Sequence, residues 1–111
     1  MYANTSKKCK IESAGFDFSI RVSELVKYLK SSGKDFPLSE RLLVCGINIG
    51  LACRRVGGNP DKDSVNAATE LLAEADYIME IAVVGGYLTK QQGVHVRMNA
   101  IEIIKMLKEE L

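Results

Sequence analysis

The sequence predicts an all-α protein, folded as an antiparallel up-and-down four-helix bundle. In four separate segments the apolar residues recur at spacings of three and four, which places them on one side of an α-helix. The connections between these segments are short and contain the glycine, proline and capping residues that end and begin helices. No segment shows the alternation of a β-strand, so no other fold class competes.

Length and composition fit one globular domain. The chain has 111 residues, of which 47% are apolar and 26% charged, enough to bury a core without metal or disulfides. No apolar run approaches the roughly 20 residues that cross a bilayer, and the first ten residues lack the apolar stretch of a signal peptide. The three cysteines are odd in number, and we expect Cys45 and Cys53 to be buried free thiols. We therefore expect a cytoplasmic protein without membrane contact.

The bundle is expected over residues 13–111, after a mobile polar tail at 1–12 that is rich in lysine. The first helix is predicted over 13–30, because five apolar residues there share one stripe: Phe18, Val22, Leu25, Val26 and Leu29. This helix ends before Gly33, which can take a left-handed conformation, and Pro37 suits the first turn of the next helix.

The second helix, predicted over 38–56, contains two internal glycines. Its inward stripe comprises Leu42, Cys45, Ile49, Cys53 and Val56. Gly46 and Gly50 lie four residues apart on one face, and each costs about 1 kcal/mol relative to alanine in a helix. That cost indicates a need for small size, so we predict that a neighbouring helix packs closely against both glycines. The alternative is that a very stable helix tolerates them.

The third and fourth helices are predicted over 63–84 and 90–110. Asp61 or Asp63 can cap the third helix, while residues 89–92 form the pattern of a capping box. The apolar face assigned to the fourth helix consists of Val94, Met98, Ile101, Ile104 and Leu111, extended round the side by Val96, Ile103 and Met106. This face is wider than one intramolecular groove needs, which indicates a subunit interface.

The residues assemble no catalytic site. His95 is the single histidine, so neither a Cys/His zinc site nor a repeated di-iron signature is present, and we expect no metal and no cofactor. No nucleophile is paired with a base, so we expect no catalytic residue and no enzymatic activity. The alternative from another class is a small enzyme or ligand-binding bundle whose site is unrecognised.

Positive charge is concentrated in the first half of the chain. Residues 1–58 carry ten Lys/Arg against five Asp/Glu, whereas residues 59–111 carry five against nine. This asymmetry fits internal charge complementarity, or faces of like charge that meet partners. Arg54 and Arg55, in the last turn of the second helix, suit the helix dipole and could also grip phosphate. The candidate RNA-binding residues are therefore Lys7, Lys8, Lys10, Arg21, Lys27, Lys30, Arg41, Arg54 and Arg55.

An ordered set of packing motifs resembles a known family. The set comprises Phe16-Asp-Phe-Ser-Ile-Arg-Val, Leu38-Ser-Glu-Arg-Leu-Leu, Gly46-Ile-Asn-Ile-Gly50, Gly86-Tyr-Leu-Thr and Ile104-Lys-Met-Leu. Across residues 14–111 the chain resembles the small bacterial four-helix-bundle proteins of the 23S rRNA intervening-sequence family. Relatives of that family include the accessory variability determinant of diversity-generating retroelements, a basic pentameric bundle that binds a reverse transcriptase and nucleic acid.

The resemblance implies a cytoplasmic antiparallel bundle that assembles into a ring-like homopentamer, with RNA or a nucleic-acid-processing protein as its partner. It implies no reaction, because its motifs are packing motifs. After the pair Ile49-Gly50 the family pattern usually offers an asparagine and a glutamate, whereas this chain has Ala52 and Arg54-Arg55. We therefore expect a non-enzymatic homo-oligomer that serves as an assembly or nucleic-acid-associated adaptor.

Overall fold

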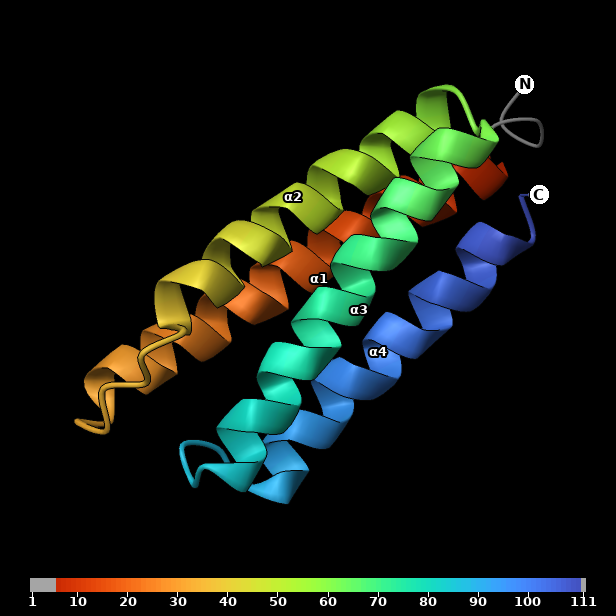
Figure 1. Cartoon of the computed structure of the whole chain (residues 1–111). Helices are drawn as coiled ribbons and strands as arrows, with labels where there is room; N and C mark the ends of the chain where they lie inside the picture. Colours follow the sequence, from red (N-terminus) through yellow and green to blue (C-terminus); the bar gives the residue numbers. More distant parts are fainter. Residues whose placement is uncertain (1–5, 111) are drawn as a thin grey trace.

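The computed structural model describes residues 6–110 of the chain, and the side chains of residues 10–110. Four α-helices are joined by short connections: α1 (Ser6–Ser31), α2 (Ser39–Gly58), α3 (Lys62–Val84) and α4 (Lys90–Lys108). No strand occurs in the described residues, and successive helices run in opposite directions along an elongated molecule (Figure 1). The predicted all-α four-helix bundle is therefore confirmed.

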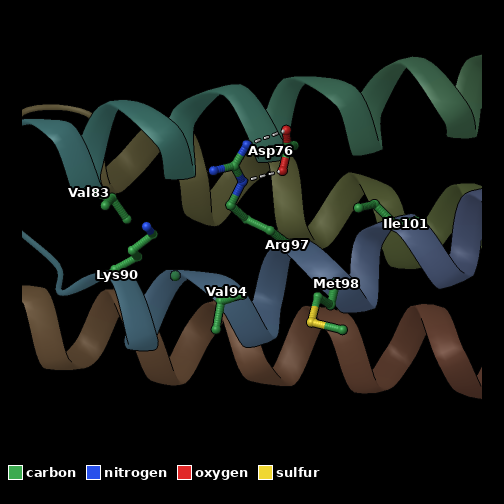
Figure 2. Close-up of a pocket in the computed structure, with 8 residues that line it drawn as sticks. Asp76, Val83, Lys90, Val94, Arg97, Met98 and Ile101 are labelled. Atoms are coloured by element: carbon green, nitrogen blue, oxygen red, sulfur yellow. Dashed lines mark hydrogen bonds and ion pairs between the residues drawn. The ribbon is translucent and has the colours of Figure 1, made fainter.

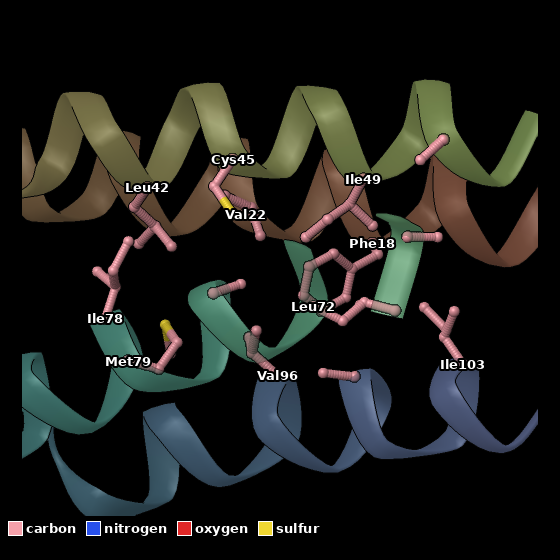
Figure 3. Packing of buried hydrophobic residues seen from close by; sticks show 14 of the residues in the cluster. Phe18, Val22, Leu42, Cys45, Ile49, Leu72, Ile78, Met79, Val96 and Ile103 are labelled. Atoms are coloured by element: carbon pink, nitrogen blue, oxygen red, sulfur yellow. The ribbon is translucent and has the colours of Figure 1, made fainter. Parts of the chain in front are cut away.

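The helices form two layers around one core. The helix α1 packs on α2, α2 on α3, α3 on α4 and α4 on α1, so the pair α1 and α2 lies opposite the pair α3 and α4. The apolar side chains between the pairs form one continuous cluster (Figure 3). Fully buried large side chains in it include Phe18, Leu42, Ile49, Leu72, Met79 and Ile103. Burial of each such side chain stabilises the folded protein by roughly 1.5–3 kcal/mol.

The beginning of α1 differs from the sequence prediction. The helix begins at Ser6 rather than at residue 13, so a tail over 1–12 is wrong for residues 6–12, while residues 1–5 lie outside the described part. Ile11 explains the difference, because it is 1% exposed and extends the buried stripe of α1 by about two turns. Periodicity did not predict this part of the helix, because Ile11 is a single apolar residue beside several lysines.

The glycines of α2 lie against α1 at very short range. A Cβ atom on Gly46 would lie 2.7 Å from Val22 Cγ1, and one on Gly50 would collide with Ser19 Oγ. Ser19 Oγ donates a hydrogen bond to the Gly46 carbonyl oxygen at 2.7 Å and also lies 3.1 Å from the Gly15 carbonyl oxygen. The small residues therefore allow α1 and α2 to touch along their backbones, and the serine fixes their register.

The row of α4 that enters the core contains Val96 and Ile103 from the side extension of the predicted face, instead of its main row. Val96, Ala100, Ile103 and Leu107 are buried together with Gly93, whereas Val94, Met98 and Ile101 of the predicted face are exposed, and Leu111 lies outside the described residues. Small residues decide the orientation of the helix: a Cβ on Gly93 would lie 2.6 Å from Val83 Cγ2. The helix turns its smallest side chains toward α3 because this permits the closest packing.

The helix ends follow local capping chemistry. Asp61, rather than Asp63, accepts a hydrogen bond from the Ser64 backbone N–H at 2.7 Å, and the capping box at 89–92 is present. Gly33 has φ of +79°, as a left-handed helix ending requires. Pro37 precedes the N-cap of α2 instead of entering its first turn, α2 continues to Gly58, and α4 ends at Lys108 instead of 110.

Candidate interaction surfaces

The outer side of the pair α1 and α2 carries exposed apolar residues. We define the α1/α2 face as Phe16, Ile20, Ile47 and Leu51, of which Phe16 is 54% and Leu51 51% exposed. Three of these side chains, Phe16, Ile47 and Leu51, line a hollow of about 220 Å³, and Ser19, Gly50 and Arg54 complete its lining. Gly50 has no side chain, so it leaves space for this hollow and also allows α1 to pack closely on α2.

The same pair of helices forms a second hollow of about 490 Å³. Four polar side chains of α1 line it, together with Val26 of α1 and Leu43 of α2: Ser23, Lys27, Lys30 and Ser31. Lys30 forms an ion pair with Glu40 at the start of α2, whereas Lys27 forms no ion pair with a described residue. The hollows of the α1/α2 side are therefore flanked by cations: Lys27 and Lys30 line one, and Arg54 lines the other.

The outer side of the pair α3 and α4 carries a second set of exposed apolar residues. We define the α3/α4 face as Tyr77, Ile81, Val84, Val94, Met98 and Ile101, with Val84 82% and Tyr77 65% exposed. Figure 2 shows the hollow of about 270 Å³ on this side, lined by Val83, Val94, Met98 and Ile101, with Lys90 at its edge. The two faces lie on opposite sides of the bundle, because they belong to opposite helix pairs.

An ion pair joins α3 and α4 at this second hollow. Arg97 donates from Nε to Asp76 Oδ1 at 2.7 Å and from Nη2 to Oδ2 at 3.3 Å, a bidentate arrangement visible in Figure 2. Glu80 Oε1 is 3.9 Å from the same Nη2. The hydrogen bonds with Asp76 are the main cause that raises the pKa of Arg97, so the guanidinium remains charged and held in place.

The nine predicted RNA-binding cations are not brought together in one patch. The side chains of Lys7 and Lys8 lie outside the described residues, and the other seven are exposed. Lys30 pairs with Glu40 and Arg41 with Glu74, so two of these seven charges are partnered within the chain. Since α1 and α2 are antiparallel, the remaining cations are distributed along the length of the bundle: Lys10, Arg21, Lys27, Arg54 and Arg55.

Three candidate cations, Lys10, Arg54 and Arg55, belong to the same end of the bundle. Arg54 and Arg55, in the last turns of α2, lie beside the beginning of α1, where Glu12 approaches Gly57 and Lys10 is exposed. Neither arginine forms an ion pair with a described residue. Ala52, by contrast, is 2% exposed and belongs to the core, so only the arginines change the surface at the positions where the family pattern differs.

The chemistry of the described residues is limited at the two buried thiols and in the grouping of possible metal ligands. Burial raises the pKa of both thiols, Cys45 and Cys53, to about 11, and Cys45 Sγ donates to the Leu71 carbonyl oxygen at 3.2 Å. Both thiols are therefore protonated at neutral pH and are weak nucleophiles. In the described residues no group of three or more His, Cys, Asp or Glu side chains is placed to hold a metal ion.

The sequence reasoning missed the α1/α2 face. Phe16 with Ile20 and Ile47 with Leu51 are pairs spaced by four residues, a spacing that places each pair on one helix face. Each pair lies on the side of its helix opposite the main apolar stripe. A second apolar stripe on an amphipathic helix is the signal that would have revealed this face.

The arrangement defines a class, a small antiparallel four-helix bundle with apolar outer faces, and comparison with known proteins agrees with the fold. A crystal structure of a protein of unknown function from the S23 ribosomal protein family of Bacteroides thetaiotaomicron superposes with a TM-score of 0.83. The two chains are 25% identical, over 92% of this chain and 91% of that chain. No protein-family profile and no curated protein matches the sequence. The chain therefore shares its fold, at family level, with a member of the S23 ribosomal protein family.

Among the described residues, none of the four helices is both long enough and apolar enough to span a bilayer.

Proposed function

We propose that the protein acts without enzymatic chemistry, as a self-associating bundle whose copies contact one another through the α1/α2 and α3/α4 faces. The observation that carries this proposal is the exposure of large apolar side chains on two opposite sides of the molecule. Contiguous apolar patches beside a concave hollow are characteristic of protein interfaces, whereas isolated apolar residues are common on any surface. Here three exposed apolar residues of each face line a hollow, and further exposed apolar residues lie on the same helix pair.

The resemblance to the 23S rRNA intervening-sequence family supports a ring-like homopentamer as the form of this assembly, and a cytoplasmic location. An assembly of this kind repeats every surface feature of one copy several times. Linked copies can raise avidity by roughly 10²- to 10⁴-fold when one partner reaches several of them. The role that follows is an adaptor, on which RNA or a nucleic-acid-processing protein such as a reverse transcriptase is gathered.

Substitution of an exposed face residue tests self-association. Leu51→Asp places a charge on the α1/α2 face without touching the core, because Leu51 is half exposed. Tyr28→Asp is the matched control, since Tyr28 is also a partly exposed apolar residue of the first helix pair but belongs to neither face. Sedimentation velocity should show dissociation for Leu51→Asp and an unchanged oligomer for Tyr28→Asp. Equal sedimentation of the parent and both variants would contradict the proposal.

Contact with RNA is a second proposed activity, favoured by the cations at one end of the bundle. Lys10 and Arg55 are exposed there, and neither forms an ion pair with a described residue. Two cations are too few for tight binding by one copy, so this activity depends on the repeated copies of the assembly. Arg54 flanks the α1/α2 hollow, and for this reason Lys10 and Arg55 provide the cleaner test.

The RNA test compares two double variants at graded salt. Lys10→Gln with Arg55→Gln should weaken binding to different RNA sequences alike, and should reduce the salt slope by roughly 0.7 for each lost contact to a single strand. The control, Arg21→Gln with Lys34→Gln, removes the same charge away from this end of the bundle. Although Arg21 is a candidate from the sequence, the proposal confines RNA contact to the end that carries Lys10 and Arg55, so this control should retain the parental slope. If the two double variants bind alike, RNA does not contact this end, and the adaptor must act through protein partners.

A further inference from the structure

We propose that a hollow between α2 and α3 binds a free aliphatic amino acid, with the ligand's carboxylate on Arg41 and its ammonium group on Glu74. The hollow has a volume of about 350 Å³, within the range of about 300–1,000 Å³ that is usual for small-molecule sites. It lies on a third side of the bundle, between the α1/α2 and α3/α4 faces, because α2 packs on α3 (Figure 1). Association through those two faces leaves this side open, so the two activities are independent.

The residues that line the hollow share one face of each helix. Those of α2 recur mainly at spacings of three and four: Glu40, Arg41, Val44, Cys45 and Asn48. Leu71 and Glu74 line it from α3, three residues apart. The thiol of Cys45, a residue that is 2% exposed, donates to the Leu71 carbonyl oxygen at 3.2 Å. The two helices are therefore joined at the floor of the hollow.

Opposite charges lie side by side at this hollow. Arg41 Nε donates to Glu74 Oε2 at 2.9 Å. The terminal nitrogens of Arg41 and the second carboxylate oxygen of Glu74 form no hydrogen bond with a described residue. Free guanidinium N–H groups match a carboxylate, and a free carboxylate oxygen matches an ammonium group. The ion pair thus offers adjacent positions for the two charged groups of an amino acid.

The charges that line the hollow are balanced, which favours a zwitterion over an ion of one sign. Glu40 also lines the hollow, but it forms an ion pair with Lys30. Two cations therefore compensate two carboxylates. An ion with a single charge is attracted by one member of the pair Arg41 and Glu74 and repelled by the other, whereas a free amino acid carries both charges at neutral pH and complements both members.

The rest of the lining accommodates the uncharged part of the ligand. Within the described part of the chain the Asn48 carboxamide has no hydrogen-bond partner, so it can donate to the ligand carboxylate or accept from the ammonium group. Val44 is 54% exposed and Leu71 is partly buried against the core. These two side chains offer apolar surface to an aliphatic side chain, and L-leucine is therefore the probe of choice.

Titration of the isotope-labelled protein with L-leucine and two matched analogues, followed by nuclear magnetic resonance, tests the site. Isocaproate is leucine without the ammonium group, and isoamylamine is leucine without the carboxylate. Leucine should shift the amide signals of residues 41–48 and 71–74 saturably, and each analogue should bind at least roughly tenfold more weakly, because it loses one charged contact. No saturable shift with leucine would overturn the proposal, as would equal binding of either analogue.

Variants of the ion pair place the binding at Arg41 and Glu74. Arg41→Gln and Glu74→Gln should each weaken leucine binding by roughly tenfold or more, because each removes the charge that faces one end of the ligand. Arg21→Gln and Glu102→Gln are the matched controls, since both residues are exposed and lie outside this hollow. The controls should bind leucine like the parent, and circular dichroism checks that all four variants remain helical. Parental affinity in the variants of the ion pair would overturn the proposal.

Discussion

At the scale of single residues, Gly46 and Gly50 set how closely α1 and α2 approach. The side chain opposite Gly46 is Val22, a β-branched residue in the core with little freedom to rotate away. Space for even one methyl group is therefore missing at this position, although Gly46 lies in a helix where alanine is otherwise preferred. The same helix ends with Gly58, around which a Cβ would meet no atom within 4 Å.

Alanine at these two glycines should have opposite effects. We expect Gly46→Ala to destabilise the protein by about 1–3 kcal/mol through overpacking against Val22. Gly58→Ala should be neutral or stabilising by about 0.4–1 kcal/mol, because it restricts the unfolded chain in open space. Urea unfolding of both variants measures the difference, and a Gly46→Ala variant as stable as the parent would show that α1 is not held against α2.

The two buried thiols should be protected in the folded protein. Cys45 and Cys53 have pKa values raised to about 11 by burial, so below pH 9.0 they are protonated as well as inaccessible. Iodoacetamide should label them only after unfolding, as measured by peptide mass spectrometry. Because the pKa values of both thiols in the folded protein lie above the ordinary 9.0, burying them in protonated form contributes fully to stability below pH 9.0. This contribution is lost as the pH rises toward 11, since the thiols of the unfolded chain then ionise. Rapid native labelling would contradict the core packing.

At the scale of helices, Asp61 makes the stability of the N-terminal cap of α3 depend on pH. Its carboxylate accepts a hydrogen bond from the Ser64 backbone N–H, and this bond lowers the pKa of Asp61 below its ordinary value of 3.8. The folded pKa is depressed, so the stabilisation is present above pH 3.8 and is lost as the pH falls through the lower folded value.

Asp61→Asn provides the corresponding test, because asparagine caps helices but carries no titrating charge. The parent should melt at a higher temperature than the variant at neutral pH, and this difference should shrink as the pH falls below 3.8. Thermal unfolding followed by circular dichroism at several pH values measures it. A difference that stays constant across this range would mean that the charge of Asp61 does not stabilise the cap.

The helices also show how much the sequence can predict. The helices α2, α3 and α4 are found within two residues at each end, since glycines and side-chain caps mark most of those ends locally. The orientation of α4 is not local: several rows of its surface are apolar, and Gly93 and Ala100 select the buried row only when α3 is in place. The burial of Ile11 is likewise not predictable from its neighbours in the sequence, because it depends on the core residues that Ile11 packs against.

At the scale of the whole molecule, the candidate surfaces depend on which helices become neighbours. Phe16 and Leu51 are far apart in the sequence, yet antiparallel pairing of α1 and α2 places them around one hollow. The same pairing disperses the predicted cations along the bundle, so a concentration of positive charge in sequence does not become one patch in space. Periodicity predicts faces of single helices, whereas these surfaces are formed by pairs.

The mass of the parent chain in solution tests the central claim, self-association through exposed apolar faces, most directly. Light scattering on the purified protein at micromolar concentration should give a multiple of the 12.2 kDa of one chain. On dilution the mass should fall toward that of one chain, because the copies that cover the apolar faces then dissociate. A single species of 12.2 kDa at every concentration would contradict the account, and would mean that both apolar faces remain exposed to water in the isolated protein.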